Sequence, residues 1–166
     1  MSKVNFLKHD YRIEDAQNTV KCGIVDGEDA SPAYTTSRRD VKWNATICNP
    51  QARMFQFVPV DNNIIYYRDN GEKESSCDGM LLVEENDMIA FVELKDVQRG
   101  GYADAIEQLR TTISYFVQNH QYDIFRLRRA YAANIAHPNF HYNMKDQMES
   151  FRKLRFILYP EATINF

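Results

Sequence analysis

The chain has 166 residues, of which 44% are hydrophobic, and a formal net charge of −3. This composition excludes a disordered chain, and no apolar run reaches the roughly 18 residues that would predict a membrane span. A domain that holds DNA by bulk charge alone is usually basic, so the charge counts against tight nonspecific DNA binding. The length predicts a single domain over residues 1–166.

The N-terminus and the cysteines together indicate an intracellular protein. Met1–Phe6 contains no apolar segment of the kind found in secretory signals. The three cysteines are odd in number and too widely spaced for a zinc site. We therefore expect a cytoplasmic protein with reduced, mostly buried thiols, at Cys22, Cys48 and Cys77.

The first third of the chain predicts one helix and one strand. Apolar residues over 6–20 favour a helix, although their spacing is imperfect. Residues 41–47 alternate like a strand that carries Trp43 on its apolar face. Trp43 either packs in the core, which we favour, or stacks on a nucleobase. Asp26 and its acidic neighbours are expected in a solvated loop.

Residues 54–69 predict a first hairpin. Phe55–Val60 and Ile64–Tyr67 are two apolar runs around the turn Asp61–Asn63. Pro59 cannot donate a ladder hydrogen bond, which indicates an edge strand or a bulge.

A second hairpin is the centre of the chain. The apolar runs Met80–Val83 and Met88–Val92 are separated by the polar turn Glu84–Asp87. With this turn, Val83 faces Met88 and Asp78 comes to lie opposite Glu93, about 5 Å away between Cβ atoms. Strand alternation places Lys95 on the same face as Glu93, roughly 6–7 Å away.

Three ionisable side chains therefore converge at one end of an otherwise apolar hairpin. Two carboxylates at this distance repel one another. A divalent cation between them removes the repulsion, since carboxylate oxygens suit Mg²⁺ or Mn²⁺. The alternative is that the hairpin frays here and that Asp78, Glu93 and Lys95 point into water.

The remaining chain predicts helices that alternate with strands. Residues 102–119 carry an apolar stripe at helical spacing, with Gln108 at its border. A strand over 125–135, a short helix over 143–153 and a strand over 154–159 follow. His137 and His141 are expected to be surface residues. The order predicts an α/β (α+β) fold with a mixed central β-sheet flanked by helices, in which 88–94 is the central strand.

Asp78, the hairpin, the run Glu93-Leu94-Lys95 and the helix with Gln108 resemble the PD-(D/E)XK nuclease superfamily, which has the restriction-endonuclease-like fold. The resemblance covers residues 54–116, and Cys77 stands where the family's name has a variable Pro. It implies that Asp78, Glu93 and the backbone carbonyl of Leu94 hold Mg²⁺ or Mn²⁺.

The resemblance also assigns roles to further residues. Lys95 would hold or deprotonate the attacking water, and Gln108 would orient water or phosphate. A helix ahead of the sheet often supplies another acid in this family, for which Glu14 is the first candidate and Asp10 the second.

We therefore expect a metal-dependent nuclease that hydrolyses phosphodiester bonds in nucleic acid, with DNA as the expected substrate, and a homodimer is a plausible assembly. One alternative is a catalytically retired nuclease fold that binds nucleic acid or protein in a larger complex. Another is a structural subunit. Basic clusters are either solvated or line a groove for phosphates; they lie at Arg38-Arg39 with Lys42, at Arg126 with Arg128-Arg129, and at Arg152-Lys153 with Arg155.

Overall fold

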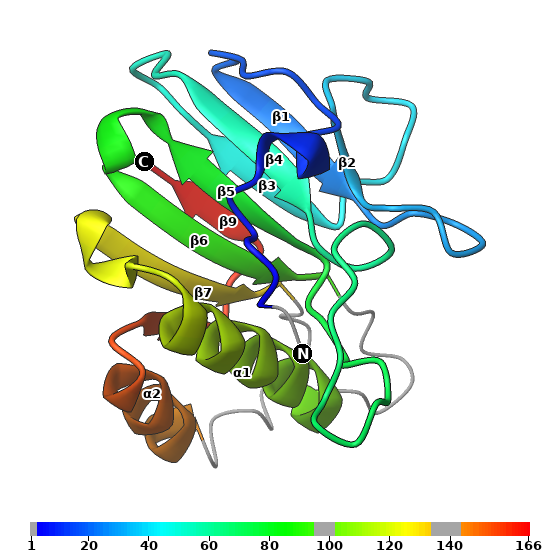
Figure 1. Cartoon of the computed structure of the whole chain (residues 1–166). Coiled ribbons are helices and arrows are strands. Elements are labelled where there is room, and N and C mark those ends of the chain that lie inside the picture. Colours follow the sequence, from blue (N-terminus) through cyan, green and yellow to red (C-terminus); the bar gives the residue numbers. More distant parts are fainter. Residues whose placement is uncertain (1–2, 95–101, 134–143) are drawn as a thin grey trace.

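The computed structural model describes residues 3–94, 102–133 and 144–166, which form two β-sheets and two α-helices (Figure 1). The strands are β1 (Lys21–Val25), β2 (Tyr34–Thr36), β3 (Ala45–Cys48), β4 (Phe55–Pro59), β5 (Gly79–Val83), β6 (Met88–Glu93), β7 (Leu127–Ala132), β8 (Ile157–Tyr159) and β9 (Thr163–Asn165). The helices are α1 (Tyr102–Asn119) and α2 (Met144–Lys153).

Both sheets are mixed. The first has the strand order β2-β1-β3-β9, with β9 parallel to β3 and the other pairs antiparallel. The second has the order β4-β5-β6-β7-β8, with β6, β7 and β8 parallel to one another. The predicted α+β class with a mixed sheet is confirmed. The chain forms two sheets rather than one central sheet flanked by helices, because the second sheet takes the face opposite the helices. The restriction-endonuclease-like assignment stays a prediction.

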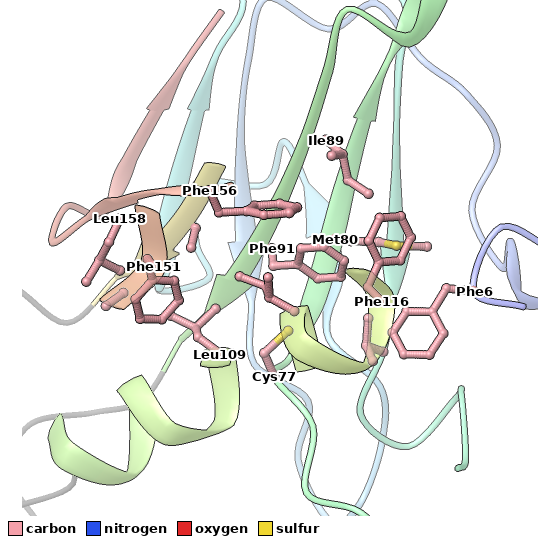
Figure 2. Close-up of a cluster of buried hydrophobic side chains, with 14 of the residues drawn as sticks. Phe6, Cys77, Met80, Ile89, Phe91, Leu109, Phe116, Phe151, Phe156 and Leu158 are labelled. Carbon is pink, nitrogen blue, oxygen red and sulfur yellow. The ribbon is translucent and has the colours of Figure 1, made fainter. Parts of the chain in front are cut away.

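The structure has three layers. Apolar side chains of the two sheets pack against each other in one core, which includes Ile24, Ile47 and Phe57. A second core lies between the other face of the five-stranded sheet and the helices (Figure 2). In Figure 1, α1 and α2 lie on the side of the five-stranded sheet away from β1 and β2.

The strand β6 contributes to both cores, as expected for a central strand. Met88, Ala90 and Val92 belong to the core between the sheets, and Ile89 and Phe91 belong to the core under the helices. All six residues of β6 are buried. A strand that is buried on both faces has a continuous run of apolar residues. This run allowed β6 to be predicted from the sequence.

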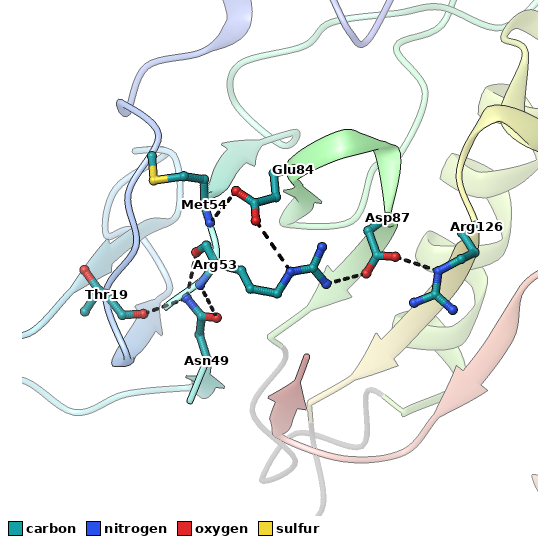
Figure 3. Close-up of polar contacts among 7 residues, drawn as sticks. All are labelled: Thr19, Asn49, Arg53, Met54, Glu84, Asp87 and Arg126. Carbon is teal, nitrogen blue, oxygen red and sulfur yellow. Dashed lines mark hydrogen bonds and ion pairs between the residues drawn. The ribbon is translucent and has the colours of Figure 1, made fainter. Parts of the chain in front are cut away.

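The predicted register of the central hairpin is confirmed. Val83 pairs with Met88, and Gly79 pairs with Val92. At the turn, Asp87 binds two arginines: its Oδ2 lies 2.6 Å from Arg53 Nη1 and its Oδ1 lies 2.6 Å from Arg126 Nε (Figure 3). These contacts tie the turn to the start of β4 and to the chain just before β7.

The predicted helix over residues 6–20 is wrong. Only His9–Tyr11 forms a short 3-10 helix, and Gln17 pairs as extended chain with Phe55. The cause is tertiary packing: Phe6 is fully buried among the rings of Tyr66, Tyr115 and Phe116. Burial of an aromatic ring outweighs a weak helical pattern.

Two further expectations need correction. Residues 64–67 do not form the partner of β4, because β4 pairs with β5 on one side and contacts Gln17 on the other. Pro59 does lie in an edge strand, as predicted. The strand expected over 41–47 is shorter and begins later in the chain, as β3 (Ala45–Cys48). The short strands β1, β2 and β9 were not predicted.

Within residues 3–94, 102–133 and 144–166, neither α-helix is long and apolar enough to cross a lipid bilayer.

Candidate active site

The candidate site lies where β5 begins and β6 ends. Asp78 precedes the first residue of β5, and Glu93 is the last residue of β6. Because Gly79 pairs with Val92, the antiparallel register brings Asp78 beside Glu93. The Glu93 side chain acts directly on the pKa of Asp78, so these two carboxyl groups converge as expected from the sequence and the hairpin does not fray between them.

Each carboxyl group also has a protein donor. The N–H of Leu94 donates a 2.6 Å hydrogen bond to Asp78 Oδ2. The Gln108 amide, oriented as its hydrogen bonds require, donates to Glu93 Oε2 at 2.9 Å and to Oε1 at 3.2 Å. Glu93 is only 4% exposed. The structure therefore brings Asp78, Glu93, Leu94 and Gln108 together.

The environment of Asp78 favours its protonated form. Burial raises the pKa of this carboxyl to about 6, against the opposing effects of the Leu94 N–H and the Glu93 side chain. The negative charges of Asp26 and Asp61 contribute to this raised value. A carboxyl group whose pKa is raised in this way is typical of functional sites.

The charges of Asp26 and Asp61 also act on Asp78, an effect that sequence reasoning missed. Asp26 is exposed in the loop after β1, as expected. Its pKa is raised, first by partial desolvation of the carboxyl and also by Asp61. The N–H of Asp61 donates to Cys77 O at 3.1 Å, next to Asp78. One signal was present in the sequence: both acids come directly after apolar strands, but nothing showed that these strand ends meet.

Glu14 and Asp10, the further acids that the resemblance suggested, do not lie beside Asp78. Glu14 accepts hydrogen bonds from the N–H of Thr35, at 2.8 Å, and from its hydroxyl, so its carboxylate is directed at β2. Asp10 forms an exposed ion pair with Lys8, with 2.9 Å between Nζ and Oδ2. The helix that would have carried Glu14 and Asp10 towards the site does not form, so neither is brought to Asp78 in the part of the chain that the structure describes.

Several expected residues lie outside the described residues. These are Lys95, His137 and His141, and they are therefore not placed. For Leu94, the structure describes a buried residue whose N–H contacts Asp78.

The donor set suits a hard cation. Asp78 and Glu93 offer carboxylate oxygens, the ligands that Mg²⁺ and Mn²⁺ prefer, and Mg²⁺ keeps several water ligands of its own. Among the described residues, no group of three or more His, Cys, Asp or Glu side chains has a metal-binding arrangement. The carboxylates that could serve as ligands at this position are those of Asp78 and Glu93.

Cys77 lies beside the site, and its thiol is not activated as a nucleophile. Its pKa is raised well above the ordinary value, first by burial and then by the charges of Glu93 and Asp78. Its N–H donates to Thr112 Oγ1 at 2.9 Å, and this hydroxyl donates to Gln108 O at 2.8 Å. Thr112 thereby fixes the turn of α1 that carries Gln108 against the start of β5.

Comparison of the chain with protein-family models, with curated proteins and with solved structures gives no match.

Proposed function

We propose that the protein is a metal-dependent nuclease that hydrolyses phosphodiester bonds in nucleic acid, with DNA as the expected substrate. The observation that carries this proposal is the contact between Asp78 and Glu93 at the end of the central strand, with Gln108 bound to Glu93. Asp78, Glu93 and the Leu94 carbonyl would hold Mg²⁺ or Mn²⁺. The same arrangement underlies the resemblance to the PD-(D/E)XK superfamily.

The negative charge of Asp78 and Glu93 suits them to hold a divalent cation for phosphodiester hydrolysis. A divalent cation held here would supply a more acidic water and would neutralise charge on the scissile phosphate. Asp78 must lose its proton to act as a ligand, which its pKa of about 6 permits at neutral pH. Gln108 holds the Glu93 carboxylate in one orientation. Lys95 would position or deprotonate the attacking water.

One observation favours the alternative of a retired nuclease fold that binds nucleic acid or protein. The Gln108 amide donates to both carboxylate oxygens of Glu93, so a protein group already binds this carboxylate. In that case the protein would not bind Mn²⁺ at this pair. Isothermal calorimetry with Mn²⁺ separates the two functions, because the nuclease requires the cation and the binding module does not.

The decisive experiment is a cleavage assay on supercoiled DNA, circular single-stranded DNA and RNA, each with Mg²⁺, Mn²⁺ or EDTA. We expect metal-dependent cleavage by the parent and a loss of several orders of magnitude in Glu93→Gln. Glu85→Gln is the matched control, since Glu85 is exposed at the opposite end of the same hairpin. Equal cleavage by Glu93→Gln and the parent, or a parent that neither cleaves nor binds Mn²⁺, would overturn the proposal.

We also propose, from the resemblance alone, that the active form is a homodimer. Light scattering at the assay concentration measures this directly, and a monomeric mass would contradict it.

A further inference from the structure

Trp43 is held against the outer face of the four-stranded sheet. A Cβ atom built on Gly23 of β1 would lie 2.1 Å from Trp43 Cγ, so the indole rests directly on the Gly23 backbone. The indole N–H donates to Arg38 O at 2.8 Å. These two contacts fix the ring in place, and only glycine at position 23 leaves room for it.

A cation lies over the same ring. The guanidinium carbon of Arg39 is 5.8 Å from the Trp43 ring centroid, which is within cation–π range. Arg39 and the nearby Lys42 are exposed. The ion pairs in the described ranges involve neither of them, whereas Arg38 is paired with Asp40. This part of the surface therefore combines an aromatic ring with two cations that no carboxylate is seen to neutralise.

The surrounding sheet face is polar and open. Gly23 pairs with Thr36 on one side and with Thr46 on the other, and Thr46 pairs with Thr163, so their side chains share the face that Trp43 covers. Both α-helices pack on the far side of the five-stranded sheet (Figure 1). In the described ranges, neither of them covers this face.

Trp43 and the candidate active site lie in different layers of the structure. Trp43 lies on the outer face of the four-stranded sheet, against Gly23. Glu93 is bound by Gln108 of α1, on the helix side of the five-stranded sheet.

We propose that Arg39, whose guanidinium lies over the Trp43 ring, forms with Trp43 a stacking subsite for an unpaired nucleobase, and that Lys42 binds the adjacent phosphate. Bases of single strands stack on aromatic and guanidinium planes, whereas bases in a duplex are paired and already stacked. The subsite therefore selects single-stranded nucleic acid. Its role in cleavage rests on the proposed nuclease function, but binding at the subsite does not.

The test uses Trp43 as its own reporter, because it is the only tryptophan in the chain. The protein is titrated in EDTA with a thymidine oligonucleotide of about 12 residues, a length within the usual range of such sites. We expect quenching of the tryptophan fluorescence, and a duplex of the same length should quench it far less. No quenching, or equal quenching by the duplex, would overturn the proposal.

Variants separate stacking from a purely structural role of the ring. Binding of a labelled oligonucleotide should weaken about 10-fold or more in Trp43→Ala and in Arg39→Ala, but little in Trp43→Phe, which keeps an aromatic plane. Gly23→Ala should displace the ring and weaken binding as well. Tyr67→Ala is the control, since Tyr67 is 52% exposed and lies outside both sheets. Parent-like binding by folded Arg39→Ala and Trp43→Ala would refute the subsite.

The two proposals fail in different ways. Quenching in EDTA without cleavage under any metal would leave the stacking subsite standing and count against the nuclease. Cleavage of single strands at the parent rate by folded Trp43→Ala, with unchanged oligonucleotide binding, would overturn the subsite and leave the nuclease standing.

Discussion

The N–H of Phe6 donates a 2.9 Å hydrogen bond to Nε2 of His120, at the C-terminal end of α1. The other ring nitrogen, Nδ1, lies 3.0 Å from Phe116 O, to which it donates because Nε2 is the acceptor. The imidazole is therefore neutral and holds the N-terminal segment against the aromatic core. Burial lowers its pKa below the ordinary value of 6.5, against the opposing bond to Phe116.

This bond predicts a loss of stability in mild acid. A lowered pKa in the folded state means that the unfolded chain binds the proton first, so the contribution of His120 is complete above about pH 6.5 and declines as the pH falls below it. Urea unfolding of the parent should show this decline. His120→Gln, which keeps an acceptor but does not titrate, should lose less stability over the same range, and an identical decline would contradict the assignment.

Asp78 predicts a pH dependence of the opposite sign. Its folded pKa of about 6 lies above the ordinary 3.8, so its contribution to stability is complete below about pH 3.8 and is lost as the pH rises through 6. Near pH 8 and without metal, Asp78→Asn should therefore unfold at a higher urea concentration than the parent. Its free energy of unfolding should be larger by about 1–3 kcal/mol. The difference should vanish near pH 4, and the exposed control Asp69→Asn should show neither effect.

The Asp87 carboxylate is expected to stabilise the fold through the turn of the central hairpin. Hydrogen bonds from Arg126 and then from Arg53 lower its pKa, so its contribution is present above about pH 4 and is lost in stronger acid. Asp87→Ala should destabilise the fold by about 1–3 kcal/mol, since two arginines lose their acceptor. Asp40→Ala removes the acid of an exposed pair with Arg38 and should change little. Equal effects of the two variants in thermal unfolding would contradict this.

Gln108 is predicted to act as a positioning residue through Glu93. Gln108→Met removes the amide that donates to both carboxylate oxygens, and we expect about 10–100-fold weaker Mn²⁺ binding. A purely structural residue would lower the folded fraction without weakening Mn²⁺ binding by the folded protein. Gln118→Met, at an exposed position of the same helix, is the control.

The central hairpin, α1 and α2 could be predicted because their information is local. The polar turn Glu84–Asp87 fixes the register of two apolar runs, and helical spacing defines residues 102–119. That register was enough to place Asp78 beside Glu93. The helix expected over 6–20 does not form because Phe6 packs against residues that include Phe116 and His120, more than a hundred positions away.

The first sheet and two of the acids could not be predicted because they depend on distant pairings. Three residues of β9 carry too little pattern to indicate a strand, and β9 exists because it pairs with β3. Asp26 and Asp61 follow different strands in different sheets. Their proximity to Asp78 emerges only when the ends of both sheets meet.

The parallel pairing of β9 with β3 also sets an order for assembly. The four-stranded sheet begins with β1 near the N-terminus and receives its last strand only when residues 163–165 are available. Until then one edge of β3 is exposed, and bare strand edges on incomplete chains favour misassociation between molecules. Contacts this distant in sequence slow folding. A ribosome-bound chain would therefore carry an unfinished sheet until residues 163–165 have emerged.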